Sequence, residues 1–191
     1  MSTPGDAAHP NASTRLVLIS HATTTATRRA AFPNDEPLDR PGAMQPVDLG
    51  RIASFRTGPE LRCRQTAAAL GWDCTVEPAL ADLDFGAWRG QTLGEVADTS
   101  WLTDLNAAPH GGESVHDLLA RVGTWLDGLR GLGERVAAVT HPAVIRAAVV
   151  HVLSAPAQSF WRIDVVPLSY TQLSHRGSHW TLRETGHAVN Q

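Results

Sequence analysis

Residues 15–24 read RLVLISHATT, and residues 135–142 read RVAAVTHP. Each segment is a short apolar run followed at once by a histidine, His21 in the first and His141 in the second. Continuous apolar runs of this length are typical of strands buried on both faces of a sheet. Pro142 can occupy the first turn of a helix. The two segments therefore predict buried strands that end in histidines, the second leading directly into a helix.

Helical and extended patterns alternate along the rest of the chain. The clearest helix is predicted over residues 113–130, where apolar residues recur at the helical period. Other helices are expected near residues 27–31, within a long loop over 22–50, and over 60–70, 92–98 and 142–153. Further strands are expected over residues 51–56, 74–77, 162–166, 169–174 and 179–184. Such alternation predicts an α/β fold, a three-layer α/β/α sandwich with a largely parallel sheet.

Length and composition limit the class of protein. The chain has 191 residues, of which 42% are hydrophobic, so we expect one domain over residues 15–186 after a flexible tail over 1–14. The formal net charge of −3 excludes nucleic-acid binding through bulk positive charge. Apolar runs are too short for a membrane span, and no secretion signal is visible. These observations predict a cytoplasmic protein with no membrane partner; the oligomeric state cannot be read from the sequence.

The basic residues are all arginine, because the chain contains no lysine. A Schiff-base lysine and a P-loop lysine are therefore excluded. Any anion site must be built from arginine, histidine and backbone N–H groups.

Three chain segments are expected to bring cationic side chains to one edge of the sheet. His21 and His141 follow two buried strands, and Arg62 lies in the first turn of the helix predicted after strand 51–56. In open α/β sheets, ligands bind beyond the carboxyl ends of the strands. Two imidazoles and a guanidinium could converge there on one phosphate. A histidine after a strand can also be a plain turn residue, and spacing alone does not decide between these interpretations.

Five segments, taken in order, resemble the motifs of the histidine phosphatase superfamily, which has the phosphoglycerate-mutase-like fold. SHATT at 20–24 resembles Arg-His-Gly-Glu-Thr, and GPELRCRQTA at 58–67 resembles Ser-Pro-Leu-x-Arg-Ala-x-Gln-Thr-Ala. LADLDFGAWRG at 80–90 resembles Leu-x-Glu-x-x-Phe-Gly-x-Trp-Glu-Gly. GGES at 111–114 and VTHP at 139–142 resemble the last two motifs, Gly-Gly-Glu-Ser and a strand followed by Ser/Thr-His-Gly.

The resemblance implies hydrolysis of a small phosphomonoester through a phosphohistidine, without a metal or other cofactor. The ligand would be a small phosphorylated metabolite or inorganic phosphate. The implied roles are nucleophile for His21, general acid for Asp82 and transition-state stabilisation for His141. The phosphate-binding residues implied by the same motifs are Arg62, Ser20, Thr24 and His141.

The first motif departs from the family pattern, with Ser20 in place of arginine and Ala22 in place of glycine. A charge-assisted hydrogen bond is worth about 1.5–3 kcal/mol, so its loss would cost about ten- to a few-hundredfold in rate. The candidate replacements are Arg28, Arg29 and Arg56.

The Ser20 departure supports an alternative, a pseudophosphatase that keeps the anion pocket as a metabolite-binding or partner-binding module. Retention of Asp82 favours an enzyme, because a binding site needs no general acid. A mutase would need further cationic groups to retain a bisphosphorylated intermediate. His175 with His179, and His110 with His116, lack a carboxylate or cysteine at ligand spacing, so no metal site is predicted there.

Overall fold

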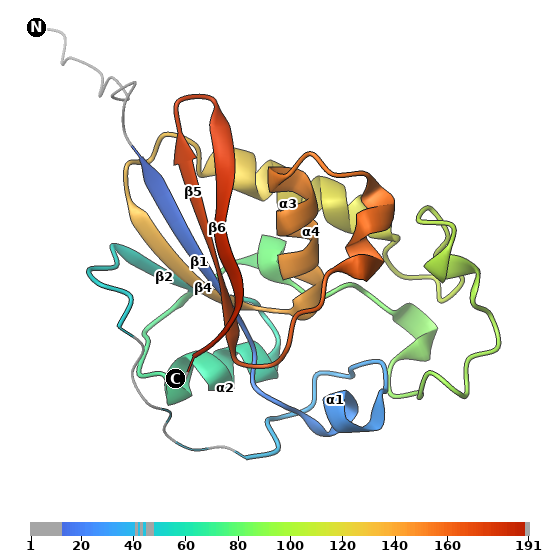
Figure 1. The fold of residues 1–191 in the computed structure, drawn as a ribbon. Helices are drawn as coiled ribbons and strands as arrows, with labels where there is room; N and C mark the ends of the chain where they lie inside the picture. The colour runs from blue at the N-terminus through green and yellow to red at the C-terminus, as the bar shows by residue number, and fades with distance from the viewer. Residues whose placement is uncertain (1–12, 41, 43, 45–47, 190–191) are drawn as a thin grey trace, which may run out of the picture.

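The computed structural model describes residues 13–40, 42, 44 and 48–189. Its centre is a six-stranded sheet in the order β3-β2-β4-β1-β5-β6 (Figure 1). Neighbouring strands among β3, β2, β4 and β1 are parallel, whereas β5 and β6 are antiparallel. The strands are β1 (Thr14–Ser20), β2 (Ser54–Thr57), β3 (Thr75–Val76), β4 (Arg135–Thr140), β5 (Ser169–Arg176) and β6 (His179–Ala188).

Helices cover both faces of the sheet because the central strands are apolar on both sides. Leu16 and Leu18 of β1 belong to the cluster that packs against α3 (Val115–Gly128) and α4 (Pro142–Val152). Val17 and Ile19 belong to the opposite cluster, which packs against α2 (Leu61–Ala69). The expected three-layer α/β/α sandwich is confirmed, with two antiparallel strands at one edge of an otherwise parallel sheet.

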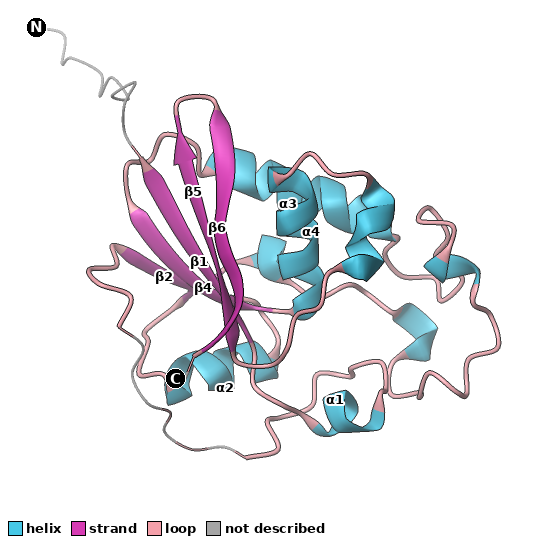
Figure 2. Cartoon of the chain, viewed as in Figure 1, coloured by secondary structure: helices cyan, strands magenta, loops and turns pink. Residues whose placement is uncertain are grey.

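Much of the chain between β1 and β2, and between β3 and α3, is loop (Figure 2). The first of these stretches contains α1 (Thr25–Arg29), which starts two residues earlier than expected. Short 3₁₀ turns occur at η1 (Pro78–Leu80), η2 (Gly86–Trp88), η3 (Ser100–Leu102) and η4 (Ala157–Arg162). Among the described residues, no helix has the length and apolar character needed to cross a membrane.

Two expected elements were wrong. Residues 92–98 form no helix: residues 93–95 make a turn, in which Glu95 accepts hydrogen bonds from the backbone and hydroxyl of Thr92, and Thr92 itself forms a β-bridge with Ala31. Residues 162–166 form no strand, because β5 already pairs with the free edge of β1. Thr14, expected in the tail, is the first residue of β1, and residues 1–12 lie outside the described part of the chain.

Candidate functional site

The two histidines meet because their strands are paired neighbours. Ser20 at the end of β1 is in register with Thr140 at the end of β4. The His21 backbone N–H then donates to the carbonyl of Thr140 at 2.9 Å. The rings of His21 and His141 are 5.2 Å apart between centroids, at an angle of 65°. Both imidazoles therefore lie at the carboxyl edge of the sheet, as the sequence predicted.

The orientation of His21 leaves one ring nitrogen available for reaction. Nδ1 lies 2.8 Å from the carbonyl oxygen of Ala22, which can only accept, so Nδ1 carries the proton. Burial, followed by the positive charge of His141, lowers the pKa of His21 to about 4. His21 is therefore neutral near pH 7, with a lone pair on Nε2. That is the state a nitrogen nucleophile requires.

Arg62 is a buried cation with spare hydrogen-bond donors. Only 2% of its surface is exposed. Its Nη2 donates to Oδ2 of Asp82 at 2.7 Å. Nε and Nη1 are buried and have no hydrogen-bond partner among the described residues. A buried charged donor without a partner is costly, so an arginine in this state is suited to binding an anion.

His141 lies between two carboxylates. Its Nδ1 is 3.4 Å from Oδ2 of Asp82, and its Nε2 is 2.7 Å from Oε2 of Glu60. Burial alone would lower the pKa of His141, but the charge of Asp82 and contacts with Cys63 and Glu60 raise it to about 10. His141 is therefore an imidazolium. In turn, the charges of His141 and Arg62 outweigh burial and hold the pKa of Asp82 below its usual range.

Helix α3 fixes the segment that carries Asp82. Arg121 donates from Nη1 to the carbonyls of Ala79 (2.8 Å) and Ala81 (3.1 Å), and from Nη2 to that of Asp82 (3.3 Å). Glu113, at the start of α3, accepts from Nε and Nη2 of the same arginine. Because a single guanidinium satisfies three carbonyls of residues 79–82, the backbone around Asp82 has a defined position.

A cleft of about 200 Å³ opens beside these groups. Thr24, one of the expected phosphate ligands, lines it, and its hydroxyl donates to Oε1 of Glu36 at 2.7 Å. Ser20, the other uncharged candidate, is fully buried, and its hydroxyl has no hydrogen-bond partner among the described residues. Three of the charged groups described above line the same cleft, namely His21, Arg62 and Asp82.

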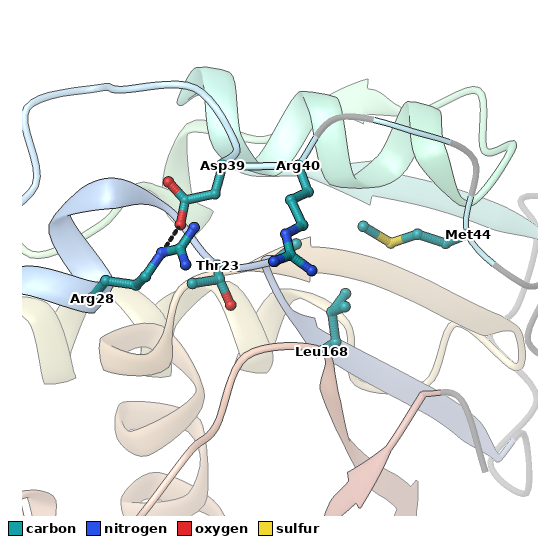
Figure 3. Close-up of a pocket in the computed structure, with 7 residues that line it drawn as sticks. Thr23, Arg28, Asp39, Arg40, Met44 and Leu168 are labelled. Atoms are coloured by element: carbon teal, nitrogen blue, oxygen red, sulfur yellow. Dashed lines mark hydrogen bonds and ion pairs between the residues drawn. The ribbon is translucent and has the colours of Figure 1, made fainter.

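None of the three candidate replacement arginines lines this cleft. Arg56 pairs with Glu77 at 3.0 Å, and Arg29 is an exposed residue of α1. Arg28 pairs with Asp39 at the edge of a separate cavity of about 360 Å³ (Figure 3). In that view, the Arg40 side chain projects into the same cavity beside Arg28.

Sequence reasoning missed Arg146, which does line the cleft. It projects from α4, and its Nε donates to the carbonyl of Ile163 at 2.8 Å. Its guanidinium lies 6.0 Å from the ring centroid of Phe160. The available signal was a single arginine in a helix whose other residues are apolar except His151, about one and a half turns after His141.

The family model of the histidine phosphatase superfamily (branch 1) matches residues 16–187. The chain belongs to this superfamily. A bifunctional protein of Mycobacterium tuberculosis is 33% identical over 140 residues, but the chain spans only 38% of that relative's length. Glucosyl-3-phosphoglycerate phosphatase of Mycolicibacterium vanbaalenii is 28% identical over 175 residues, covering 76% of this chain and 77% of that protein.

Solved structures of superfamily members share the fold. A mycobacterial glucosyl-3-phosphoglycerate phosphatase in complex with VO3 has a TM-score of 0.74 at 24% identity, covering 91% of this chain and 98% of that one. A putative alpha-ribazole-5'-P phosphatase from Escherichia coli reaches 0.78 at 18% identity, covering 93% and 98%. The expected phosphoglycerate-mutase-like fold is thus confirmed.

Proposed function

We propose that the chain is a metal-independent phosphohydrolase that acts on a small phosphomonoester through a phosphohistidine. The observation that carries this proposal is the pair of unpartnered donors of buried Arg62, which lie in the same cleft as neutral His21. The names of relatives support phosphate-ester hydrolysis as the general activity. The cleft volume of about 200 Å³ favours a small substrate.

Substrate binding would begin with an exchange of partners. Asp82 holds both Arg62 and His141 through Oδ2, so an incoming phosphate must take over those cations. The phosphate would also meet the N-terminus of α4, which starts at Pro142. Once Asp82 loses its two positive partners, the pKa of its carboxyl rises, because their charge is what holds it low. Asp82 can then carry a proton as a general acid.

Phosphoryl transfer would follow in two steps. In the first, the lone pair on Nε2 of His21 forms the N–P bond while the P–O bond to the leaving alcohol breaks. That oxygen takes the proton of Asp82, and the cations stabilise the charge on the other phosphate oxygens. In the second, Asp82 removes a proton from water, which attacks phosphorus as the N–P bond breaks. Inorganic phosphate leaves and His21 returns to its neutral state.

Arg146 would supply the cation that the first motif lacks. Side chains alternate along a strand, so Ser20 shares the face of β1 that Leu16 and Leu18 present to α3 and α4. Arg146 approaches the cleft from α4 on this same face. Its Nη1 and Nη2 make no hydrogen bond within the described part of the chain. They are therefore available for phosphate or for a second anionic group of the substrate.

A pseudophosphatase is the second candidate, and Ser20 is the observation that favours it. Its hydroxyl is fully buried and reaches no hydrogen-bond partner among the described residues. A hydroxyl in that position cannot reproduce a guanidinium fork. In that case, the cleft would bind phosphate or a metabolite without turning it over.

Hydrolysis of p-nitrophenyl phosphate across pH 4–8, in the presence of EDTA, separates the two candidates. An enzyme should turn over the substrate, and His21→Ala should abolish turnover while leaving phosphate binding partly intact. His179→Ala is the matched control, because His179 is exposed in β6 and remote from the cleft. Turnover that is unchanged in His21→Ala contradicts the nucleophile assignment. Phosphate binding without turnover in the unmodified chain favours the pseudophosphatase.

A further inference from the structure

Three departures from the second motif meet at one atom, Nε2 of His141. Glu60 stands where the motif has leucine, and its Oε2 lies 2.7 Å from this nitrogen. Cys63 stands where the motif has alanine, and its Sγ lies 3.2 Å away. Gly58 replaces serine, and a Cβ there would come within 3.1 Å of Nε2 and 2.8 Å of the Leu80 carbonyl oxygen. The segment thus brings a carboxylate and a thiol to the imidazole, and glycine at position 58 avoids the clash that a side chain would cause there.

Thiol, imidazole and carboxylate together form a typical ligand set for zinc. One ligand atom from each of Glu60, Cys63 and His141 lies within 4.8 Å of the other two. Tetrahedral zinc would place the carboxylate oxygen about 3.4 Å from Nε2, so that contact needs to open by about 0.7 Å. Sγ also lies 3.9 Å from Nδ1, so the thiol or the imidazole ring must rotate to bring the sulfur toward the lone pair of Nε2. Glu60 heads the first turn of α2 and its side chain is 20% exposed, which gives it freedom for such a shift.

The residues that contact the three ligands also resemble the outer shell of a metal site. Nδ1 of His141 faces Oδ2 of Asp82, which forms the carboxylate–histidine pair that usually orients a metal-binding imidazole. Oε1 of Glu60 accepts the Asp82 backbone N–H at 3.0 Å, which anchors the carboxylate and leaves Oε2 for the metal. The ligand set is therefore supported by one ion pair and one hydrogen bond to Asp82.

A path from solvent reaches the cluster. Glu60 lines a cavity of about 400 Å³ with Pro59, Arg62, Ala81 and Asp82. Cys63 and His141 are fully buried behind it. A metal would therefore enter on the Glu60 side, where water from the cavity can supply a fourth ligand.

We propose that Glu60, Cys63 and His141 form a binding site for one zinc ion. The thiolate and the carboxylate balance the two positive charges of the metal. Binding releases the Cys63 thiol proton and the proton on Nε2 of His141 to solvent. The metal site would share His141 with the proposed phosphohydrolase site, whose chemistry uses no metal.

The test is titration of the untagged, EDTA-stripped chain with Co²⁺, followed by displacement with Zn²⁺. One equivalent should produce a thiolate-to-cobalt charge-transfer band and the d–d bands of a tetrahedral site. Loss of an outer-shell partner already costs about 10- to 100-fold in metal affinity, so loss of a ligand should cost at least about 100-fold. Cys63→Ala should therefore remove the charge-transfer band, and Glu60→Gln should weaken binding by that factor.

Cys74→Ala is the matched control, because Cys74 is the other cysteine of the chain and does not belong to the cluster. It should bind cobalt like the unmodified chain. Glu60→Gln keeps the shape of the side chain, so it tests the site if Cys63→Ala fails to fold. Zinc should also raise the melting temperature of the unmodified chain and of Cys74→Ala. A titration without a one-equivalent endpoint, or a charge-transfer band that persists in Cys63→Ala, would overturn the proposal.

The zinc proposal and the phosphohydrolase proposal fail separately. His21→Ala should be inactive yet bind cobalt like the unmodified chain, because His21 is not a ligand. If the unmodified chain is inactive but gives the cobalt spectrum, the metal site is supported and the phosphohydrolase proposal fails. If it hydrolyses the substrate in EDTA but binds no cobalt, the phosphohydrolase proposal is supported and the metal site fails.

Discussion

Replacing Arg146 tests whether a cation from α4 substitutes for the missing arginine of the first motif. Its Nε is already used by the carbonyl of Ile163, which leaves Nη1 and Nη2 for the substrate. One charge-assisted hydrogen bond is worth about 1.5–3 kcal/mol. Arg146→Ala should therefore lower kcat/KM by about 10- to 150-fold for a single bond made in the transition state.

The assay is steady-state hydrolysis of p-nitrophenyl phosphate, together with inhibition by inorganic phosphate. Arg146→Lys should fall between the unmodified chain and Arg146→Ala, because it keeps the charge but loses the planar fork. Arg56→Ala is the control: Arg56 is part-buried and paired with Glu77, away from the cleft. Melting curves show whether each variant remains folded.

The double variant Ser20→Arg/Arg146→Ala tests whether the two positions bind the same phosphate group. If the two positions serve one phosphate, the new arginine should recover part of the lost rate there and give little gain in the unmodified chain. A folded Arg146→Ala protein with unchanged kcat/KM and unchanged phosphate inhibition would refute the assignment.

Three further predictions concern the acid, the core and pH. Asp82→Asn should slow the hydrolysis of alkyl phosphates by about 100- to 10,000-fold. It should slow the hydrolysis of p-nitrophenyl phosphate less, because that leaving group needs less protonation. Equal losses of rate for both substrates would argue against a general acid. Leu126→Ala should lower the free energy of unfolding by about 2–5 kcal/mol, since Leu126 is fully buried in the α3 face, and urea denaturation measures this. Burial lowers the pKa of His175, so below about pH 6.5 the unfolded chain takes up a proton that the native chain does not, and stability falls. Urea denaturation from pH 7 to 5 should show a shallower decline for His175→Leu, and an identical slope would contradict this.

The sequence predicted the central features of the fold because those features depend on local pattern. The apolar runs before His21 and His141 had no polar alternation, and in the structure both strands are covered on their two faces. Arg62 followed from a helix start signalled by Pro59. Each of these residues lies where a strand or helix begins or ends, so its position along the chain also fixes its position at the sheet edge.

The missed features depend on contacts between segments far apart in the chain. Arg146 reaches the cleft because α4 packs beside the loop that carries Ile163. Glu60 meets His141 across 81 positions of sequence. Residues 162–166 had the composition of a strand, but β5, rather than this segment, pairs with β1. Which segment pairs with a given strand of the sheet, and where a long side chain points, depend on tertiary structure. Neither can be read from the local sequence pattern.

The shared carboxylate of Asp82 should also make the cleft selective among anions. It bridges Arg62 and His141 before any substrate arrives. Every anionic ligand must therefore compete for these two cations with a carboxylate that is held beside them at high effective concentration. We expect chloride and other weakly bound monoanions to gain too little to displace it. A phosphate dianion gains more, because it can also use the unpaired donors of Arg62. We therefore expect the side chain of Asp82 to reduce binding of abundant salts to the resting protein.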